Sequence, residues 1–121
     1  MSGALARVGA WLAPLALAGI ALGAASLATP VRVAGMSMAP ALGIGDIVFV
    51  SRTGAARVGD IVLIARPGHG RALHRLVGED ADGRWVVRGD ANPIPDLEPV
   101  PRAQIAGRVV GVLPVSRVFG K

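Results

Sequence analysis

The chain lacks cysteine altogether, which excludes disulfide bonds, thiolate catalysis and cysteine-ligated metals. Lysine is almost missing as well: the last residue, Lys121, is the only one, against twelve arginines. Aromatic residues make up 3% of the sequence, and the arginines stand singly rather than in runs. The net charge of +5 is compatible with nucleic acid or anionic lipid as a partner. Because neither basic clusters nor interleaved aromatics are present, we expect no nucleic-acid partner and a solvated or membrane-facing basic surface.

The longest segment without a charged residue runs from Val8 to Val31, which is 24 residues. As a helix it would reach roughly 36 Å, enough to cross the ~30 Å hydrocarbon core of a bilayer. We therefore predict a membrane anchor over residues 1–29, with one transmembrane helix at about residues 8–27. A cleaved signal peptide, with small residues at Ser26-Leu27-Ala28, and a buried core helix are the alternatives.

The rest of the chain, residues 30–121, has a different pattern, in which short runs rich in Val and Ile alternate with turns of Gly, Asp and Pro. This alternation predicts a mostly β fold, a small antiparallel β domain that follows the single N-terminal transmembrane helix. The predicted strands are Asp46–Ser51, Asp60–Ala65, Ala72–Val77, Trp85–Arg88 and Ile105–Val112.

Two of these runs open with the same Gly-Asp dipeptide, at Gly45-Asp46 and Gly59-Asp60. Aspartate bonds nearby backbone groups in turns and glycine adopts unusual φ values, so we interpret both aspartates as structural. The last segment, Val109 to Lys121, holds an apolar run too short for a second membrane span, and we expect a final strand and a tail there.

Directly after the uncharged segment comes the sequence Gly35-Met36-Ser37-Met38-Ala39-Pro40-Ala41-Leu42, closed by Gly45-Asp46. A serine between methionines, followed by proline and a Gly-Asp turn, resembles the nucleophile box of type I signal peptidases. These are membrane-bound serine proteases that remove leader peptides from exported proteins. The resemblance implies that Ser37 is a nucleophile. Its apolar neighbours Met36, Met38 and Leu42 either form a surface at the bilayer or pack in the core.

A serine hydroxyl is a poor nucleophile at neutral pH and needs a neighbouring base. Most bacterial leader peptidases, and the autoproteolytic repressors of related fold, use a lysine, but Lys121 lies outside every predicted strand. Of the two histidines, His69 lies in a turn flanked by glycines, where we expect a solvated side chain. His74 lies within a predicted strand, so we predict that His74 is the general base, for which an imidazole pKa of about 6.5 is suitable.

A histidine base is helped by a carboxylate that fixes its tautomer and stabilises the imidazolium. The acidic residues of segment 79–82 have the composition of a solvated turn. Two aspartates remain, Asp90 and Asp96, in the proline-rich stretch Gly89-Asp90-Ala91-Asn92-Pro93-Ile94-Pro95-Asp96. Sequence spacing does not choose between them.

The order of the serine box, then His74-Arg75 and an aliphatic residue, then Gly-Asp-x-Asn and a further aspartate, resembles the archaeal and endoplasmic-reticulum class of signal peptidases. This resemblance implies that Asp96 is the catalytic acid and Asp90 an auxiliary or loop-shaping acid. The family often has a serine two residues before the nucleophile, whose hydroxyl assists the oxyanion hole. Because Gly35 stands there, we expect backbone N–H groups, principally that of Ser37, to hold the oxyanion.

The resemblance implies a membrane-anchored serine endopeptidase that removes leader peptides through an acyl-enzyme, with no cofactor and no metal. Its partners would be membrane lipid and preproteins with small residues at the first and third positions before the cut. It would lie in the cell membrane as a single-pass protein, with the catalytic domain on the extracytoplasmic side. A dedicated maturation protease for one partner protein and a non-catalytic membrane-anchored binding domain are the alternatives.

Overall fold

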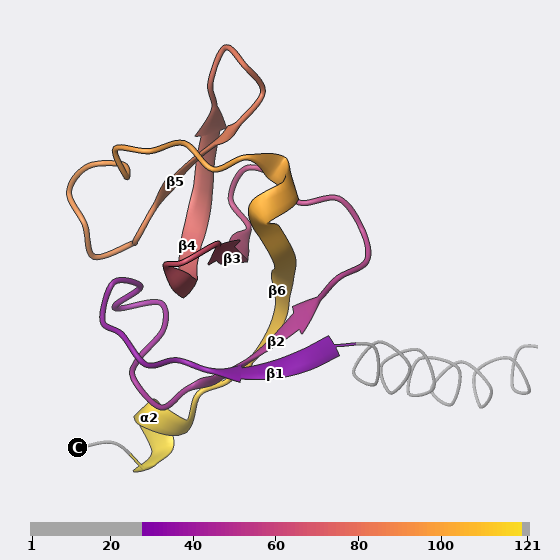
Figure 1. Cartoon of the computed structure of the whole chain (residues 1–121). Coiled ribbons are helices and arrows are strands. Elements are labelled where there is room, and N and C mark those ends of the chain that lie inside the picture. Colours follow the sequence, from indigo (N-terminus) through magenta and orange to yellow (C-terminus); the bar gives the residue numbers. More distant parts are fainter. Residues whose placement is uncertain (1–27, 120–121) are drawn as a thin grey trace, which may run out of the picture.

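The computed structural model describes residues 28–119, which form a β domain (Figure 1). The elements along the chain are β1 (Ala28–Arg32), β2 (Ile47–Ser51), β3 (Ile61–Arg66), β4 (Gly70–Glu79), β5 (Trp85–Arg88), the 3₁₀ helix η1 (Arg102–Gln104), β6 (Ile105–Leu113) and the short helix α2 (Val115–Phe119). The prediction of a small antiparallel β domain is confirmed, and β2 to β6 coincide with the five predicted strands.

The strands form one sheet in the order β1-β2-β6-β3-β4-β5, and every neighbouring pair is antiparallel. Strand β6 joins the two halves of the sheet, because it pairs with β2 along one edge and with β3 along the other. Strand β4 pairs with β3 from Gly70 to Arg75, but β5 adjoins it only from Arg75 onward. The start of β4 therefore has one edge that no strand of residues 28–119 covers.

Strand β3 carries the core on both of its faces, since Val62, Leu63 and Ile64 are all buried. Successive side chains of a strand point to opposite faces. Accordingly, Leu63 packs in one apolar cluster with Val48 and Val50, whereas Val62 and Ile64 belong to a second cluster. The other buried members of the second cluster are Leu76, Trp85, Val87 and Val100. A continuous Val/Ile/Leu run is the sequence pattern expected for a strand buried in this way.

The two Gly-Asp dipeptides form equivalent turns, as predicted. Gly45 and Gly59 both have positive φ, 93° and 98°, which glycine adopts without steric cost. The Asp46 carboxylate accepts a hydrogen bond from the Gly43 N–H at 2.9 Å, and the Asp60 carboxylate accepts one from the Arg57 N–H at 2.9 Å. Both aspartates close the turn that precedes a strand.

The prediction of a membrane-spanning helix ahead of the β domain is wrong as a description of this fold. Among residues 28–119, no helix is long and apolar enough to cross a membrane. The segment assigned to that helix, about residues 8–27, lies outside the described residues. The length and hydropathy of an uncharged segment show whether it could cross a bilayer, but they do not determine its conformation. The end of this run, Ala28 to Val31, is in fact strand, paired with β2.

Strand β1 was not predicted, because its residues read as the end of the uncharged run. It lies at the edge of the sheet, where Pro30 is tolerated since an edge strand has a side that needs no ladder hydrogen bond.

The C-terminal prediction of a strand and a tail is correct for β6, but the segment after it forms α2. The N–H of Ser116 in α2 donates to Asp46 at 2.8 Å, which ties this helix to the domain.

Candidate active site

Ser37 lies in the segment between β1 and β2, at the start of a tight turn. The Ala39 N–H donates to the Met36 carbonyl at 3.1 Å, and the Leu42 N–H donates to the Met38 carbonyl at 2.9 Å. Met38 and Leu42 are fully buried, so the turn that follows Ser37 is fixed in the core. Ser37 itself stays partly exposed.

The bilayer interpretation of the serine box is wrong for Met38 and Leu42, since both belong to the core cluster beneath the sheet. Met36 is 70% exposed and is the only one of the three apolar neighbours at the surface.

The loop after β5 lies directly against the serine. The Ala91 N–H donates to the Ser37 carbonyl oxygen at 2.9 Å. The Asp90 N–H donates to the Met38 sulfur at 3.4 Å. A Cβ atom placed on Gly89 would lie 2.6 Å from the Ser37 carbonyl oxygen and 3.0 Å from the Ser37 Cβ, so only glycine permits this approach. In Figure 1 the two segments lie on the same side of the sheet.

His74 and Asp96, the predicted base and acid, lie in hydrogen-bond contact. His74 Nδ1 lies 2.8 Å from Asp96 Oδ2, and the two side chains are only 14% and 23% exposed. The Asp96 N–H donates to the Val87 carbonyl of β5 at 2.8 Å, which fixes the carboxylate relative to the sheet that carries His74. An acceptor at Nδ1 favours the tautomer with the proton on Nδ1 and leaves Nε2 free to accept a proton.

Asp90 has a different partner. The Arg75 guanidinium donates to both Asp90 carboxylate oxygens, at 2.9 and 2.7 Å, and to the Gly59 carbonyl at 2.7 Å. These bonds from Arg75 lower the pKa of Asp90 below its ordinary value, against a smaller opposing effect of desolvation. Sequence spacing left open which aspartate accompanies His74. The structure gives Asp96 to His74 and Asp90 to Arg75, the residue that follows His74 in β4.

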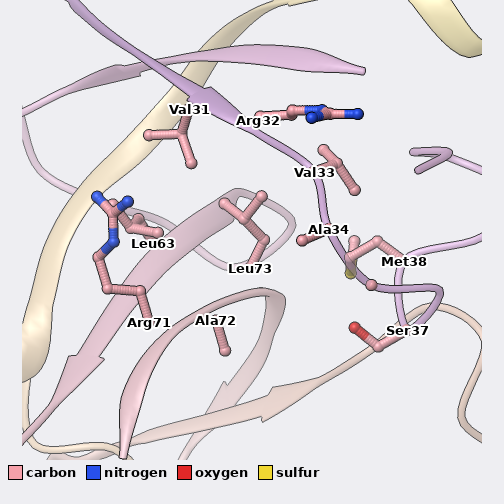
Figure 2. A pocket seen from close by; sticks show the side chains of 11 residues that line it. Val31, Arg32, Val33, Ala34, Ser37, Met38, Leu63, Arg71, Ala72 and Leu73 are labelled. Carbon is pink, nitrogen blue, oxygen red and sulfur yellow. The ribbon is translucent and has the colours of Figure 1, made fainter. Parts of the chain in front are cut away.

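Two pockets meet near these residues. A pocket of about 390 Å³ begins at Ser37 and has Ala72 and Leu73 of β4 on its facing wall. Figure 2 shows the Ser37 hydroxyl pointing toward it. A smaller one, about 110 Å³, is lined by His74, Asp96 and again Ala72. The serine and the histidine thus lie on the two sides of Ala72, and among residues 28–119 no hydrogen bond joins them. Catalytic hydrogen bonds are often long without substrate and tighten when it binds.

The oxyanion prediction concerns the Ser37 N–H and Gly35. Within residues 28–119, the Ser37 N–H donates no hydrogen bond, so it is available to a ligand. A Cβ at Gly35 would meet nothing within 4 Å, so the position has room for a side chain. The structure is compatible with a backbone donor in place of the serine hydroxyl that relatives often carry.

His69 is exposed in the turn between β3 and β4, as its sequence context indicated. It also borders the small pocket that His74 and Asp96 line. Its imidazole makes no hydrogen bond with any residue of the described range, and its backbone N–H donates to the Arg66 carbonyl at 3.0 Å. Within that range no group of three or more His, Asp or Glu side chains is arranged to hold a metal ion.

Sequence reasoning missed the contacts that hold the site together. The Arg75–Asp90 ion pair and the Gly89–Ser37 contact each join segments far apart in the chain. The signals were present, since Arg75 follows the predicted base and Gly89 opens the Gly-Asp-x-Asn phrase, but neither residue type by itself indicates a contact with the serine turn.

The fold and the site together define a small antiparallel β domain that carries a serine and a carboxylate-paired histidine, the residue types of a serine hydrolase. The Peptidase S24-like family model matches residues 16–110, most of the chain, and the chain therefore belongs to this family. It is a relative of serine peptidases. No curated protein matches the chain. The narrower resemblance to type I signal peptidases goes beyond the family match and stays a prediction.

Proposed function

We propose that this protein is a serine endopeptidase with Ser37 as nucleophile, His74 as general base and Asp96 as the acid that orients His74. The observation that carries the proposal is the 2.8 Å contact between His74 Nδ1 and Asp96 Oδ2, in the loop whose Ala91 N–H donates to the Ser37 carbonyl. Lysine, the base of most relatives, does not occur in residues 28–119.

The reaction would be acyl transfer. Ser37 Oγ attacks the scissile carbonyl carbon while Nε2 of His74 takes its proton, and Asp96 stabilises the imidazolium that results. The Ser37 N–H faces the oxyanion. Collapse of the tetrahedral intermediate breaks the peptide bond, and His74 gives the proton to the leaving amine. Water, activated by His74 in turn, hydrolyses the acyl-enzyme.

The substrate would bind in extended form along the 390 Å³ pocket. One wall is the segment from Val31 to Gly35, and the other is the start of β4, whose outer edge carries no strand before Arg75. Backbone groups at such an edge accept an added peptide strand. The pocket therefore suits a flexible peptide and not a folded surface.

We further propose, from the order of the serine box, His74-Arg75 and the Gly-Asp-x-Asn phrase, that the substrates are preproteins with small residues before the cleaved bond. Such leaders are inserted in lipid, so this proposal also locates the reaction at the extracytoplasmic surface of the cell membrane. Cleavage of one dedicated partner protein is a second candidate, since the autoproteolytic repressors of related fold act on a single target.

The test is cleavage of a preprotein with alanine at the first and third positions before the cut by the full-length protein in detergent. Wild type should produce the cut product, and Ser37→Ala should not, with an unchanged circular dichroism spectrum. His74→Ala should abolish cleavage and His69→Ala should leave it within a factor of two. If His69→Ala abolished cleavage and His74→Ala did not, the base assignment would be wrong. Cleavage by neither wild type nor variant, with peptide binding retained, would favour a non-catalytic binding domain.

A further inference from the structure

The pocket beside Ser37 has an uneven distribution of charge. Its lining includes two arginines, Arg32 and Arg71, and no Asp or Glu. The middle of the pocket is apolar and is formed by Val31, Leu63 and Leu73 (Figure 2). A ligand that fills it meets a nucleophile at one end, aliphatic side chains next, and positive charge beyond them.

Arg71 is the cation that faces the ligand. It stands opposite Ala65 in the register of β3 and β4, two residues before Leu73, which stands opposite Leu63. Residues two apart on a strand share a face, so Arg71 and Leu73 project to the same side as Leu63. Figure 2 shows the Arg71 side chain passing Leu63 in the direction of Val31, away from Ser37.

Arg71 also has no partner of its own. Within residues 28–119 its guanidinium takes part in no ion pair and no hydrogen bond, whereas four other arginines of the domain pair with carboxylates. Those four are Arg66, Arg75, Arg84 and Arg102. The residue opposite Arg71 on β3 is Ala65, whose side chain is small. The Arg71 guanidinium is therefore free to reach a ligand in the pocket. Arg32 lines the same pocket, but in Figure 2 its guanidinium points away from Arg71.

We propose that Arg71 is a specificity-determining residue that selects peptides with an acidic side chain on the amino-terminal side of the cleaved bond. The inference rests on the proposed function and deepens it. An extended peptide advances about 3.3 Å per residue, and Arg71 lies two residues beyond the Leu73 wall that faces Ser37. Because the third position carries a small residue in the proposed substrates, the acidic residue stands roughly four to five positions before the cut. The amino-terminal part of the substrate stays bound as the acyl-enzyme, so we assign this part to the pocket that extends from Ser37.

The experiment uses quenched fluorescent peptides with alanine at the first and third positions before the cut. Glu, Gln or Lys is placed in turn at each of the second, fourth, fifth and sixth positions. Cleavage by full-length wild type gives kcat/KM, and fluorescence anisotropy with the Ser37→Ala variant gives binding without chemistry. We expect Glu to be preferred over Lys about five- to tenfold at one of the distal positions, as for an exposed ion pair whose sign is reversed.

Arg71→Gln should abolish that preference and Arg71→Glu should reverse it, each measured as the ratio of kcat/KM for the Glu and Lys peptides within the same variant. Arg32→Gln is the matched control, since it removes the same charge from the same pocket lining, and it should keep the preference. Equal effects of the Arg71 and Arg32 variants would overturn the inference in favour of a general effect of positive charge. Cleavage with no preference would overturn the inference alone. A preference in binding with no cleavage by wild type would support Arg71 as a selector and overturn the peptidase. Neither binding nor cleavage of any peptide would overturn both.

Discussion

Gly89 and Ser37 are in closer contact than any other residue type at position 89 would allow. A Cβ at position 89 would lie 2.6 Å from the carbonyl oxygen of Ser37, and the neighbouring Ala91 N–H holds that same oxygen at 2.9 Å. The loop that carries Asp90 and Asp96 is therefore fitted against Ser37, the proposed nucleophile, and the position of the loop and that of the serine depend on each other.

Gly89→Ala should displace the serine turn and lower kcat/KM roughly 100-fold, because misplacement of a catalytic group by about 1 Å costs this much. The matched control is Gly78→Ala in β4, where an added Cβ meets nothing within 4 Å. Peptide cleavage at constant folded fraction, checked by circular dichroism, measures the effect. Equal activity of the two variants would mean that the serine turn can shift to accommodate the added Cβ without loss of activity.

Asp96→Asn and Asp90→Asn should separate the two aspartates. Asparagine at position 96 no longer fixes the tautomer of His74, and kcat should fall by roughly 10³- to 10⁴-fold, as at other Ser-His-Asp sites. Asparagine at position 90 breaks an ion pair with Arg75 and should act mainly on stability. The readouts are kcat and the urea midpoint for each variant. A larger loss of kcat in Asp90→Asn than in Asp96→Asn would contradict the assignment of the acid.

Arg75→Ala should lower the free energy of unfolding by roughly 2 kcal/mol, because hydrogen bonds of a charged group to Asp90 and to the Gly59 carbonyl are lost. Arg75→Lys should recover only part of this, since an ammonium lacks the planar fork that binds both carboxylate oxygens. Arg66→Ala is the control: its partner Glu98 is 83% exposed, and such surface pairs contribute about 0–1 kcal/mol. Urea unfolding of the three variants gives the comparison, and equal losses for Arg75 and Arg66 would count against a clamp at Asp90.

Asp46 predicts how stability depends on pH. Hydrogen bonds from the Ser116 side chain and from the Gly43 and Ser116 N–H groups lower the pKa of this buried carboxyl below 3.8. A carboxyl with a lowered pKa in the folded state stabilises that state above its unfolded pKa, and the contribution disappears as pH falls through the folded value. Asp46→Asn should therefore be less stable than wild type at pH 6, and the difference should narrow below about pH 4.

Urea unfolding between pH 2.5 and 6 measures this difference. Asp82→Asn, at a carboxylate whose side chain is 77% exposed, serves as the control for the change of charge alone. A constant gap between wild type and Asp46→Asn over the whole range would show that ionisation of Asp46 does not contribute.

Gly35→Ser tests the oxyanion prediction because it adds the hydroxyl group that this position lacks. The position has open space for a Cβ, so the variant should fold as wild type does. If a hydroxyl there reaches the oxyanion, kcat should rise, by about three- to tenfold, which is below the full effect of an oxyanion donor. Gly35→Ala is the control without a hydroxyl. A rise in both variants, or in neither, would show that the Ser37 N–H acts without help from this position.

The sequence was sufficient for the strands and for the list of candidate side chains. Runs of Val and Ile between glycine turns predicted five strands, because the residue pattern of a strand can be recognised within a few consecutive residues. The scarcity of lysine left His74 as the candidate base among the predicted strand residues, which is an argument from composition. The sequence failed at β1, because the uncharged run ends there and no strand was predicted over Ala28–Arg32.

The choice between Asp90 and Asp96 shows where local reasoning ends. Both aspartates lie in one loop, six positions apart in the sequence, and each has the chemistry of a catalytic acid. The bidentate bond of Arg75 occupies Asp90, and the hydrogen bond of the Asp96 N–H to Val87 brings the second carboxylate to His74. Neither bond has a local signature.

By itself, then, the sequence determined the β domain, the turn chemistry at Gly45-Asp46 and Gly59-Asp60, and the identities of Ser37 and His74 as candidates. These follow from hydrophobic periodicity, backbone preference and side-chain chemistry, which act over a few residues. Only the tertiary structure decided which carboxylate pairs with His74, why position 89 must be glycine, and that Arg71, unpaired among residues 28–119, faces the pocket of Ser37. Those depend on distances between segments remote in the chain, and such distances are fixed when β4, β5 and the serine turn pack around a common core.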